Sequence, residues 1–254
     1  MAIESPIRLH WLDPRKPDQP FPPVDSAMSE PNGLLAIGGD LSVPRIVRAY
    51  SRGIFPWYNP DEPILWWSPD PRCVFPVTAD FHVSRSLRRA LQRHDYAITI
   101  DTAFDDVVMA CARPRHSQRG TWLGREMRLA YSTLGARGYG HSIEIWRAGR
   151  LIGGLYGLAL GKAFFGESMF SLERDASKIA LVWLRRQLHA WGFGLFDCQV
   201  GSDHLYSLGA EDWSRDRFLA ALNRCVGSPA HAAPWRLQLP RPDWSAHLPD
   251  GVRA

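Results

Sequence analysis

The sequence contains few cysteines, and they are far apart. Only four cysteines occur in 254 residues, at positions 73, 111, 198 and 225. This spacing excludes zinc ribbons, zinc fingers and Cys-x-x-Cys redox pairs. The nine histidines include no His-x-x-x-His pair. We therefore expect reduced thiols and no metal site.

Long apolar runs are also missing. No stretch of 18 apolar residues occurs, which argues against a transmembrane helix. The first 18 residues contain neither an apolar core region nor a cleavage site of the kind that marks a secretory signal. A cytoplasmic protein that does not associate with membranes is the expectation.

Lysine is scarce, although the chain is basic overall. The net charge is +4, yet only Lys16, Lys162 and Lys178 are lysines, so 27 of the 30 basic residues are arginine. Codon bias alone can produce such a composition. Arginine nevertheless suits bidentate contact with phosphate better than lysine does, so the composition leaves a nucleic-acid partner open.

Periodicity predicts an α+β fold with a mixed sheet flanked by helices and a small N-terminal lobe. Residues 1–35 are rich in proline, and residues 54–72 are predicted to form a rigid aromatic loop between the lobe and the body. Helices are expected at 44–53, 84–93, 104–112, 125–138 and 176–192, and strands at 96–101, 141–147, 150–160, 163–170 and 195–200. The last strand can lie parallel beside the strand at 163–170. The expected domains are 1–74, 75–227 and a proline-rich tail at 228–254.

Two acidic residues lie in otherwise apolar strands. Residues two apart on a strand point to one face, so Asp197 and Gln199 are expected to converge while Cys198 points away. A carboxylate inside an apolar strand is costly unless it faces a pocket or a partner. Glu167 follows the aromatic strand at 163–165 and has the same requirement. Each acid alone can be a structural hydrogen-bond acceptor, but two acids on adjacent strands favour a site.

Arginines occupy one face of the predicted helix at 84–93. Arg85, Arg88, Arg89 and Arg93 share this face, and no acidic residue falls between positions 81 and 94. Such a stripe matches a phosphate backbone, although many charged helix faces are simply solvated. Trp57 and Trp122 lie in loop contexts, where a tryptophan can stack on a base, line an apolar pocket or anchor the loop.

Several familiar nucleotide-binding and catalytic motifs are missing. The glycine patterns at 153–161 follow neither the Walker spacing nor the strand–turn–helix context of a dinucleotide fingerprint. No Gly-x-Ser-x-Gly nucleophile motif occurs.

Ten segments, taken together, resemble the leucyl/phenylalanyl-tRNA–protein transferase family. They occur in family order and are EPNGLLAIGGDLS (30–42), GIFPWYNPDEPILWWSPDPR (53–72), HVSRSLRR (82–89), GTWLG (120–124), HSIEIW (141–146), GGLYG (153–157), FGESMFS (165–171), ASKIAL (176–181), DCQV (197–200) and SLGA (207–210). The resemblance implies a C-terminal domain of the GNAT-like (acyl-CoA N-acyltransferase-like) fold. It also implies an enzyme of the bacterial N-degron pathway.

Such an enzyme moves Leu, Phe or Met from aminoacyl-tRNA to the α-amino group of proteins that begin with Arg or Lys. The resemblance implies no metal or organic cofactor, and we expect a monomer. It assigns catalytic roles to Asp197 and Gln199 and places Glu167 in the same polar cluster. It assigns tRNA binding to Arg85, Arg88, Arg89 and Arg93. The implied aminoacyl pocket consists of Trp57, Trp122, Leu155, Phe164, Met169, Ser171, Leu181, Leu188 and Phe196.

Two other functions remain open from the sequence. A coenzyme-A-dependent N-acetyltransferase has the same fold class, although its usual Gln/Arg-x-x-Gly-x-Gly/Ala pyrophosphate loop is absent between Phe170 and Ala180. A non-catalytic tRNA-binding module would keep the basic stripe without needing Asp197.

Overall fold

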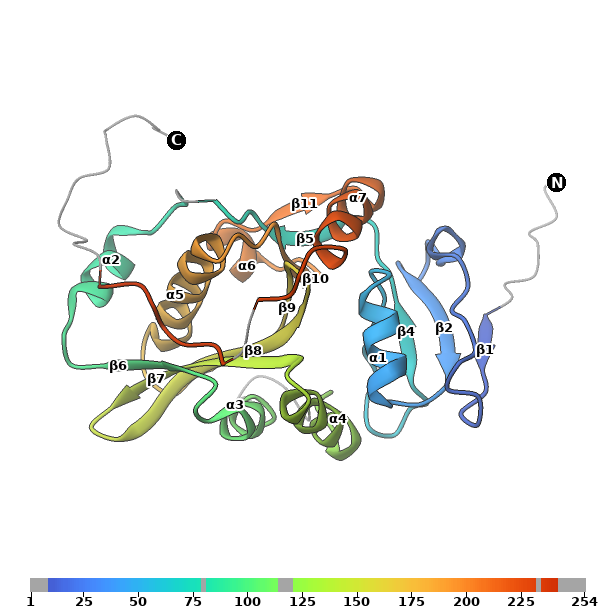
Figure 1. Cartoon of the computed structure of the whole chain (residues 1–254), viewed down its shortest axis with the longest axis horizontal. Helices are drawn as coiled ribbons and strands as arrows, with labels where there is room; N and C mark the ends of the chain where they lie inside the picture. Colours follow the sequence, from blue (N-terminus) through green and yellow to red (C-terminus); the bar gives the residue numbers. More distant parts are fainter. Residues whose placement is uncertain (1–8, 79–80, 114–120, 232–233, 242–254) are drawn as a thin grey trace.

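The computed structural model describes residues 9–78, 81–113, 121–231 and 234–241. These residues form a mixed α/β fold with two sheets and, within the described ranges, seven α-helices. Figure 1 shows the smaller sheet with helix α1 at one end of the molecule and the larger sheet with its helices at the other. No helix in the described ranges is long and apolar enough to cross a membrane.

The smaller sheet has the strand order β1-β2-β4-β3. Its elements are β1 (His10–Leu12), the short 3-10 helix η1 (Val24–Ser26), β2 (Leu34–Gly38), β3 (Phe55–Pro56) and β4 (Leu65–Trp67), with α1 (Val43–Tyr50) between β2 and β3. Trp66 is fully buried, and its indole N–H donates to the Gly38 carbonyl at 2.8 Å.

The prediction of a loop over residues 54–72 was wrong. This segment contains β3 and β4, and β5 (Arg72–Phe75) begins at its end. Its prolines concealed the strands because proline is unfavourable within a sheet. Pro56 lies in β3, which is an edge strand, and both short strands are stabilised by burial of aromatic residues, Trp66 among them.

The larger sheet has the order β11-β5-β10-β9-β8-β7-β6. Besides β5, its strands are β6 (Ala97–Ile100), β7 (Gly140–Arg147), β8 (Arg150–Leu160), β9 (Ala163–Ser171), β10 (Leu195–Gln199) and β11 (Glu211–Trp213). The β7–β8 turn places Ala148 and Gly149 at positive φ, as a tight hairpin requires. β9 and β10 are parallel, as predicted, and the other neighbouring pairs are antiparallel.

Helices cover both faces of the larger sheet (Figure 1). α5 (Ala176–Ala190) packs on one face, with α2 (Arg85–Gln92) against it, and α3 (Phe104–Cys111) and α4 (Arg125–Ala136) pack on the other. The predicted helices are confirmed with small shifts at their ends. The sequence reading missed α6 (Asp203–Ser207), β11 and α7 (Arg215–Val226).

Part of the proline-rich tail packs against the body. Trp235 is buried and stacks on the His141 ring, with ring centroids 3.6 Å apart. The Gln238 backbone N–H donates to the side-chain oxygen of Gln187 at 3.0 Å, and the Trp191 indole N–H donates to the Gln238 side chain at 2.9 Å. Residues 235–238 therefore hold the end of α5 against the sheet.

The parallel pair β9–β10 is short. Pairing joins Leu195–Asp197 to residues 163–165, after which β9 continues only beside β8. β10 has an irregularity between Asp197 and Gln199 where it pairs with β5. The sheet therefore opens where the two parallel strands stop pairing.

Candidate active site

A cavity of about 1240 Å³ lies where β9 and β10 separate. Its lining includes residues 166–169 of β9 and residues 198–200 at the end of β10. The remaining lining comes from the β3–β4 loop, β5, the end of α3, the start of α4, β8, α5 and α6. The cavity is larger than the roughly 300–1,000 Å³ of typical small-molecule sites.

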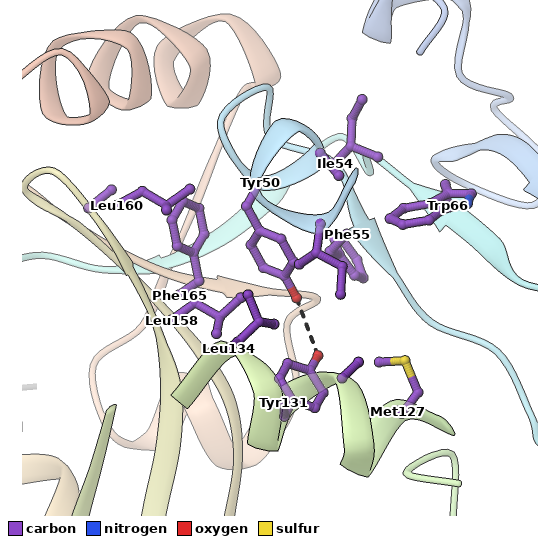
Figure 2. Packing of buried hydrophobic residues seen from close by; sticks show 14 of the residues in the cluster. Tyr50, Ile54, Phe55, Trp66, Met127, Tyr131, Leu134, Leu158, Leu160 and Phe165 are labelled. Carbon is purple, nitrogen blue, oxygen red and sulfur yellow. Dashed lines mark hydrogen bonds between the residues drawn. The ribbon is translucent and has the colours of Figure 1, made fainter. Parts of the chain in front are cut away.

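Glu167 is held at this cavity by two buried tyrosines. Tyr50 of α1 donates to Oε1 of Glu167 at 2.7 Å, and Tyr131 of α4 donates to Oε2 at 2.5 Å. The two hydroxyl oxygens lie 3.3 Å apart, and Figure 2 shows them pointing toward each other between α1 and α4. Three elements distant in the sequence therefore fix the position of the Glu167 carboxyl group.

Burial raises the pKa of the Glu167 carboxyl group from 4.5 to about 7, even though the hydrogen bonds from Tyr131 and Tyr50 oppose the shift. Burial and the nearby Glu167 charge also raise the pKa of Tyr50 and of Tyr131 well above 10. The two tyrosines therefore stay protonated donors while Glu167 changes its charge near neutral pH.

Asp197 forms a buried ion pair with Arg72. Nε of Arg72 donates to Oδ1 of Asp197 at 2.8 Å, and Nη2 donates to Oδ2 at 2.7 Å. The Arg72 guanidinium also lies between the rings of Phe55 and Phe218, and its Nη1 donates to the Gly53 carbonyl at 3.0 Å. This bidentate geometry is the strongest that Arg and a carboxylate can form. Asp197 does not line the cavity.

Gln199 connects the ion pair to the cavity. Its backbone N–H donates to Oδ1 of Asp197 at 2.9 Å, and its φ is +58°. Its side-chain Nε2 donates to Oε1 of Glu167 at 3.3 Å. In the described part of the chain, no hydrogen bond occupies Oε1 of Gln199, which leaves this oxygen as an acceptor at the cavity.

One expectation about β10 was wrong. Alternation was expected to point Asp197 and Gln199 into one pocket and Cys198 away, but Cys198 lines the cavity together with Gln199. The irregularity after Asp197 and the positive φ of Gln199 break the two-residue period. Asp197 therefore contacts the backbone N–H of Gln199, and its side chain does not line the cavity beside the Gln199 side chain.

Six of the nine residues expected in the aminoacyl pocket lie along the cavity: Trp57, Trp122, Leu155, Met169, Leu181 and Phe196. Phe164 is buried and packs edge-on against Phe196, with ring centroids 5.1 Å apart. Leu188 is fully buried in the core. Ser171 ends β9, where its hydroxyl donates to the Glu173 carbonyl and accepts from the Ser177 N–H. The apolar part of the cavity therefore lies on the α5 side of the sheet.

The arginine stripe is located on and next to α2. Arg85 and Arg89 are exposed, Arg88 is half-buried, and none of them lines the described cavity. Arg93 follows the helix and pairs with Asp95 at 2.8 Å. The stripe is therefore separate from the cavity, and Arg93 is partly neutralised.

Sequence reasoning did not single out Arg72, Tyr50 or Tyr131. Arg72 lies 125 residues before Asp197, and Tyr50 lies 117 residues before Glu167. The sequence indicated only that a buried acid requires a polar or charged partner, and it did not indicate where in the chain that partner lies. Among the described residues, no group of three or more His, Cys, Asp and Glu side chains is placed to hold a metal ion.

Two family models match the chain. The model described as leucyl/phenylalanyl-tRNA protein transferase matches residues 74–223. The model for the N-terminal domain of the same transferase matches residues 39–70. Together the two matches include every residue that lines the cavity, while Arg72 falls in the short gap between them.

Curated relatives with the same name match the chain over most of their length. A leucyl/phenylalanyl-tRNA–protein transferase from Alkalilimnicola ehrlichii is 57% identical over 230 residues, which covers 90% of this chain and 89% of the relative. One from Nitrosomonas europaea is 55% identical and covers 86% of this chain and 92% of the relative.

Solved structures resemble the chain only distantly. L-PGS from Bacillus licheniformis is 12% identical with a TM-score of 0.36, and the match covers 74% of this chain and 59% of that one. A likeness at this level indicates nothing about function.

Proposed function

The chain belongs to the leucyl/phenylalanyl-tRNA–protein transferase family, and on this premise we propose how its residues carry out the reaction. It is an aminoacyltransferase that moves Leu, Phe or Met from aminoacyl-tRNA to the α-amino group of proteins beginning with Arg or Lys. The product is marked for N-degron proteolysis. The observation that supports this activity best is the hydrogen bond between Gln199 and Glu167 at a cavity that also has apolar lining residues.

The larger sheet corresponds to a GNAT-like catalytic domain. The parallel pair β9–β10, which separates to open a cavity, supports this assignment. We divide the chain into an N-terminal domain at 1–74, a catalytic domain at 75–227 and a tail at 228–254. The change from one sheet to the other falls between Trp67 and Arg72, close to the first boundary.

The aminoacyl side chain enters the apolar side of the cavity. Leu155, Met169, Leu181 and Phe196 offer it an apolar surface, and Trp57 and Trp122 also line the cavity. Phe164 and Leu188 support this surface from behind, and Ser171 fixes the end of β9. Such a pocket distinguishes side chains that differ by one methylene by only about 1–3 kcal/mol. Acceptance of Leu, Phe and Met together is therefore expected.

The acceptor amine attacks the ester carbonyl, and the 3′-terminal hydroxyl of the tRNA leaves with a proton. A free α-amine has a pKa of about 7.7–8.0, so the neutral nucleophile is a minority form at neutral pH. Oε1 of Gln199 accepts a hydrogen bond from this amine and directs its lone pair toward the carbonyl. The leaving hydroxyl takes up the proton that the amine loses.

Asp197 is a positioning residue in this scheme. Both of its oxygens accept from Arg72, and Oδ1 also accepts from the Gln199 N–H. Its carboxylate keeps Gln199 at a positive φ that a non-glycine residue seldom adopts. Asp197 therefore affects the amine indirectly, because it fixes the conformation of Gln199.

Glu167 favours a cationic acceptor. Its carboxylate form, held by Tyr50 and Tyr131, places negative charge beside Gln199. The side chain of an N-terminal Arg or Lys is attracted to that charge within a partly buried site. Arg85, Arg88, Arg89 and Arg93 bind the backbone of the tRNA acceptor arm, with little readout of its sequence.

A donor and acceptor assay tests this function. Purified protein is incubated with radiolabelled Leu-tRNA and with either of two peptides that differ only in an N-terminal Arg or Ala. Label on the Arg peptide alone is expected. Intact tRNA binding without transfer to either peptide would contradict the proposal and favour a non-catalytic tRNA-binding protein.

A further inference from the structure

The wall of the cavity formed by α3 and α4 carries positive charge. Arg125 and Arg128 lie in the first two turns of α4, and Arg113 follows the end of α3. All three line the cavity, and the two helices pack together. We call these three residues the arginine rim.

Within the described ranges, no carboxylate oxygen lies within 4.0 Å of a guanidinium nitrogen of the arginine rim. Arg113 and Arg125 are exposed, while Arg128 is half-buried and donates from Nη1 to the Leu123 carbonyl at 3.1 Å. By contrast, Arg45 and Arg72 are buried against carboxylates. The rim therefore presents charge to the cavity that nearby acids do not neutralise.

The carboxylates that line the cavity come from other elements. Asp61 belongs to the loop between β3 and β4, and Glu167 belongs to β9. The cavity therefore has a basic wall on α3 and α4 and acidic groups elsewhere. An anionic ligand group is favoured at the rim, and a cationic one is favoured near the acids.

The donor supplies anionic groups at a fixed distance from its amino acid. Aminoacyl-tRNA carries its amino acid on a terminal nucleoside, which is joined to the rest of the strand by phosphodiesters. Trp122 borders the cavity and lies three residues before Arg125. Because the apolar residues and the start of α4 line the same cavity, a donor whose amino acid occupies the apolar side can reach the start of α4 with its last phosphates. The cavity is large enough for more than an amino acid.

We propose that the arginine rim binds the phosphodiesters next to the 3′-terminal nucleoside of the donor. This inference rests on the proposed function and extends it to a second anchoring point. The arginines of α2 lie outside the cavity lining and are assigned to the acceptor arm, whereas the rim holds the single-stranded end. Guanidinium groups suit this task because they contact phosphate in a bidentate manner.

Donors of different length test the proposal. Leucyl-adenosine has no phosphodiester, a leucylated 3′-terminal trinucleotide of tRNA has two, and Leu-tRNA has the whole strand. Transfer to the Arg peptide is measured with each donor for Arg125→Ala, Arg128→Ala and the double variant. The measured quantity is the ratio of kcat/KM for the trinucleotide to kcat/KM for leucyl-adenosine.

Each single substitution is expected to lower this ratio by about tenfold, as loss of one charge-assisted hydrogen bond does. The salt dependence of trinucleotide binding is expected to fall by about 0.7 in slope for each lost phosphate contact. Arg137→Ala is the matched control, since Arg137 is an exposed arginine at the other end of α4. It should leave the ratio unchanged.

Two results would overturn the proposal. An equal loss with leucyl-adenosine and the trinucleotide would mean that the arginines shape the cavity without binding phosphate. An unchanged ratio in the double variant would mean that the rim is a solvated surface. Failure of the unsubstituted chain to transfer from any donor is a different result, because it contradicts the proposed function itself.

Discussion

Arg72 binds both carboxylate oxygens of Asp197 inside the protein, with neither side chain more than 1% exposed. The pair joins β5 to β10. Arg72 also donates a hydrogen bond to the carbonyl of Gly53, which follows α1 in the chain. It therefore connects the N-terminal segment to the strand that carries Gln199. Because both charges are buried, each depends on the other for its compensation.

Replacement of Arg72 by Leu is expected to destabilise the fold. It leaves Asp197 as an uncompensated buried charge, which costs about 3–5 kcal/mol. For a chain of this size, Tm falls on the order of 10 °C. Thermal unfolding followed by circular dichroism measures the change.

Two comparisons make the Arg72 experiment specific. Arg15→Leu removes an arginine from an exposed ion pair with Asp13, and it should change Tm little. Adding Asp197→Asn to Arg72→Leu removes the uncompensated charge and should recover part of the lost stability. If Arg72→Leu unfolds at the same temperature as the unsubstituted chain, the ion pair is not a structural link.

The pH dependence of transfer is expected to include Glu167. Folding raises its pKa to about 7, so the carboxyl group is mostly neutral at pH 6 and mostly ionised at pH 8. If the carboxylate attracts the cationic acceptor, kcat/KM for the Arg peptide rises through pH 7. Glu167→Gln should remove this rise and leave the later one from the acceptor amine.

Stability gives an independent view of the same group. A carboxyl group whose pKa is raised in the folded state favours folding when protonated, and that contribution is lost as pH rises through about 7. The unsubstituted chain should therefore lose stability relative to Glu167→Gln between pH 5 and pH 8. Parallel pH profiles of the two proteins in chemical denaturation would show that Glu167 titrates near its ordinary pKa.

Met169→Trp is expected to fill the apolar side of the cavity. Met169 lines the cavity and is half-buried, so an indole there occupies the space assigned to the aminoacyl side chain. KM for Leu-tRNA should rise about tenfold or more, and Phe-tRNA should suffer more than Leu-tRNA because of its size. Met109→Trp, at an exposed position of α3, serves as the control. Unaltered steady-state kinetics of Met169→Trp would locate the aminoacyl pocket elsewhere.

Charge reversal on α2 is expected to weaken tRNA binding. Arg85 and Arg89 are exposed, so Arg85→Glu with Arg89→Glu should leave the fold intact and raise Kd for tRNA. The slope of log K against log salt should flatten by roughly 0.9 for each lost duplex contact. Arg150→Glu, at the exposed first residue of β8, is the control. An unchanged slope in filter binding would make this helix face a solvated one.

The central part of the larger sheet was predictable because its signals are local. Strands β7, β8 and β9 are rich in apolar residues and are joined by turns at Gly149 and Gly161, and α5 has a buried apolar face. The parallel neighbour of β9 followed from the strand–helix–strand order. The pairs Arg72–Asp197 and Tyr50–Glu167 could not be predicted, because each joins residues more than 100 positions apart.

The residue pattern and the family resemblance brought together part of the candidate site but not its geometry. Glu167 and Gln199 were expected near each other, and a hydrogen bond of 3.3 Å joins their side chains. The period of β10 was misjudged because a local irregularity at Cys198 leaves no mark in the residue pattern. Strands β3 and β4 were missed because buried aromatic residues outweigh the prolines around them.

A single-turnover assay of Gln199→Asn tests the scheme most directly. Asparagine tolerates the positive φ of this position and keeps the amide, but it is one methylene shorter and withdraws the oxygen from the amine. With saturating Leu-tRNA and Arg peptide, the transfer rate is expected to fall by about 100-fold or more, while Kd for Leu-tRNA stays the same. Transfer by Gln199→Asn at the rate of the unsubstituted chain would contradict the role of Gln199 in directing the acceptor amine.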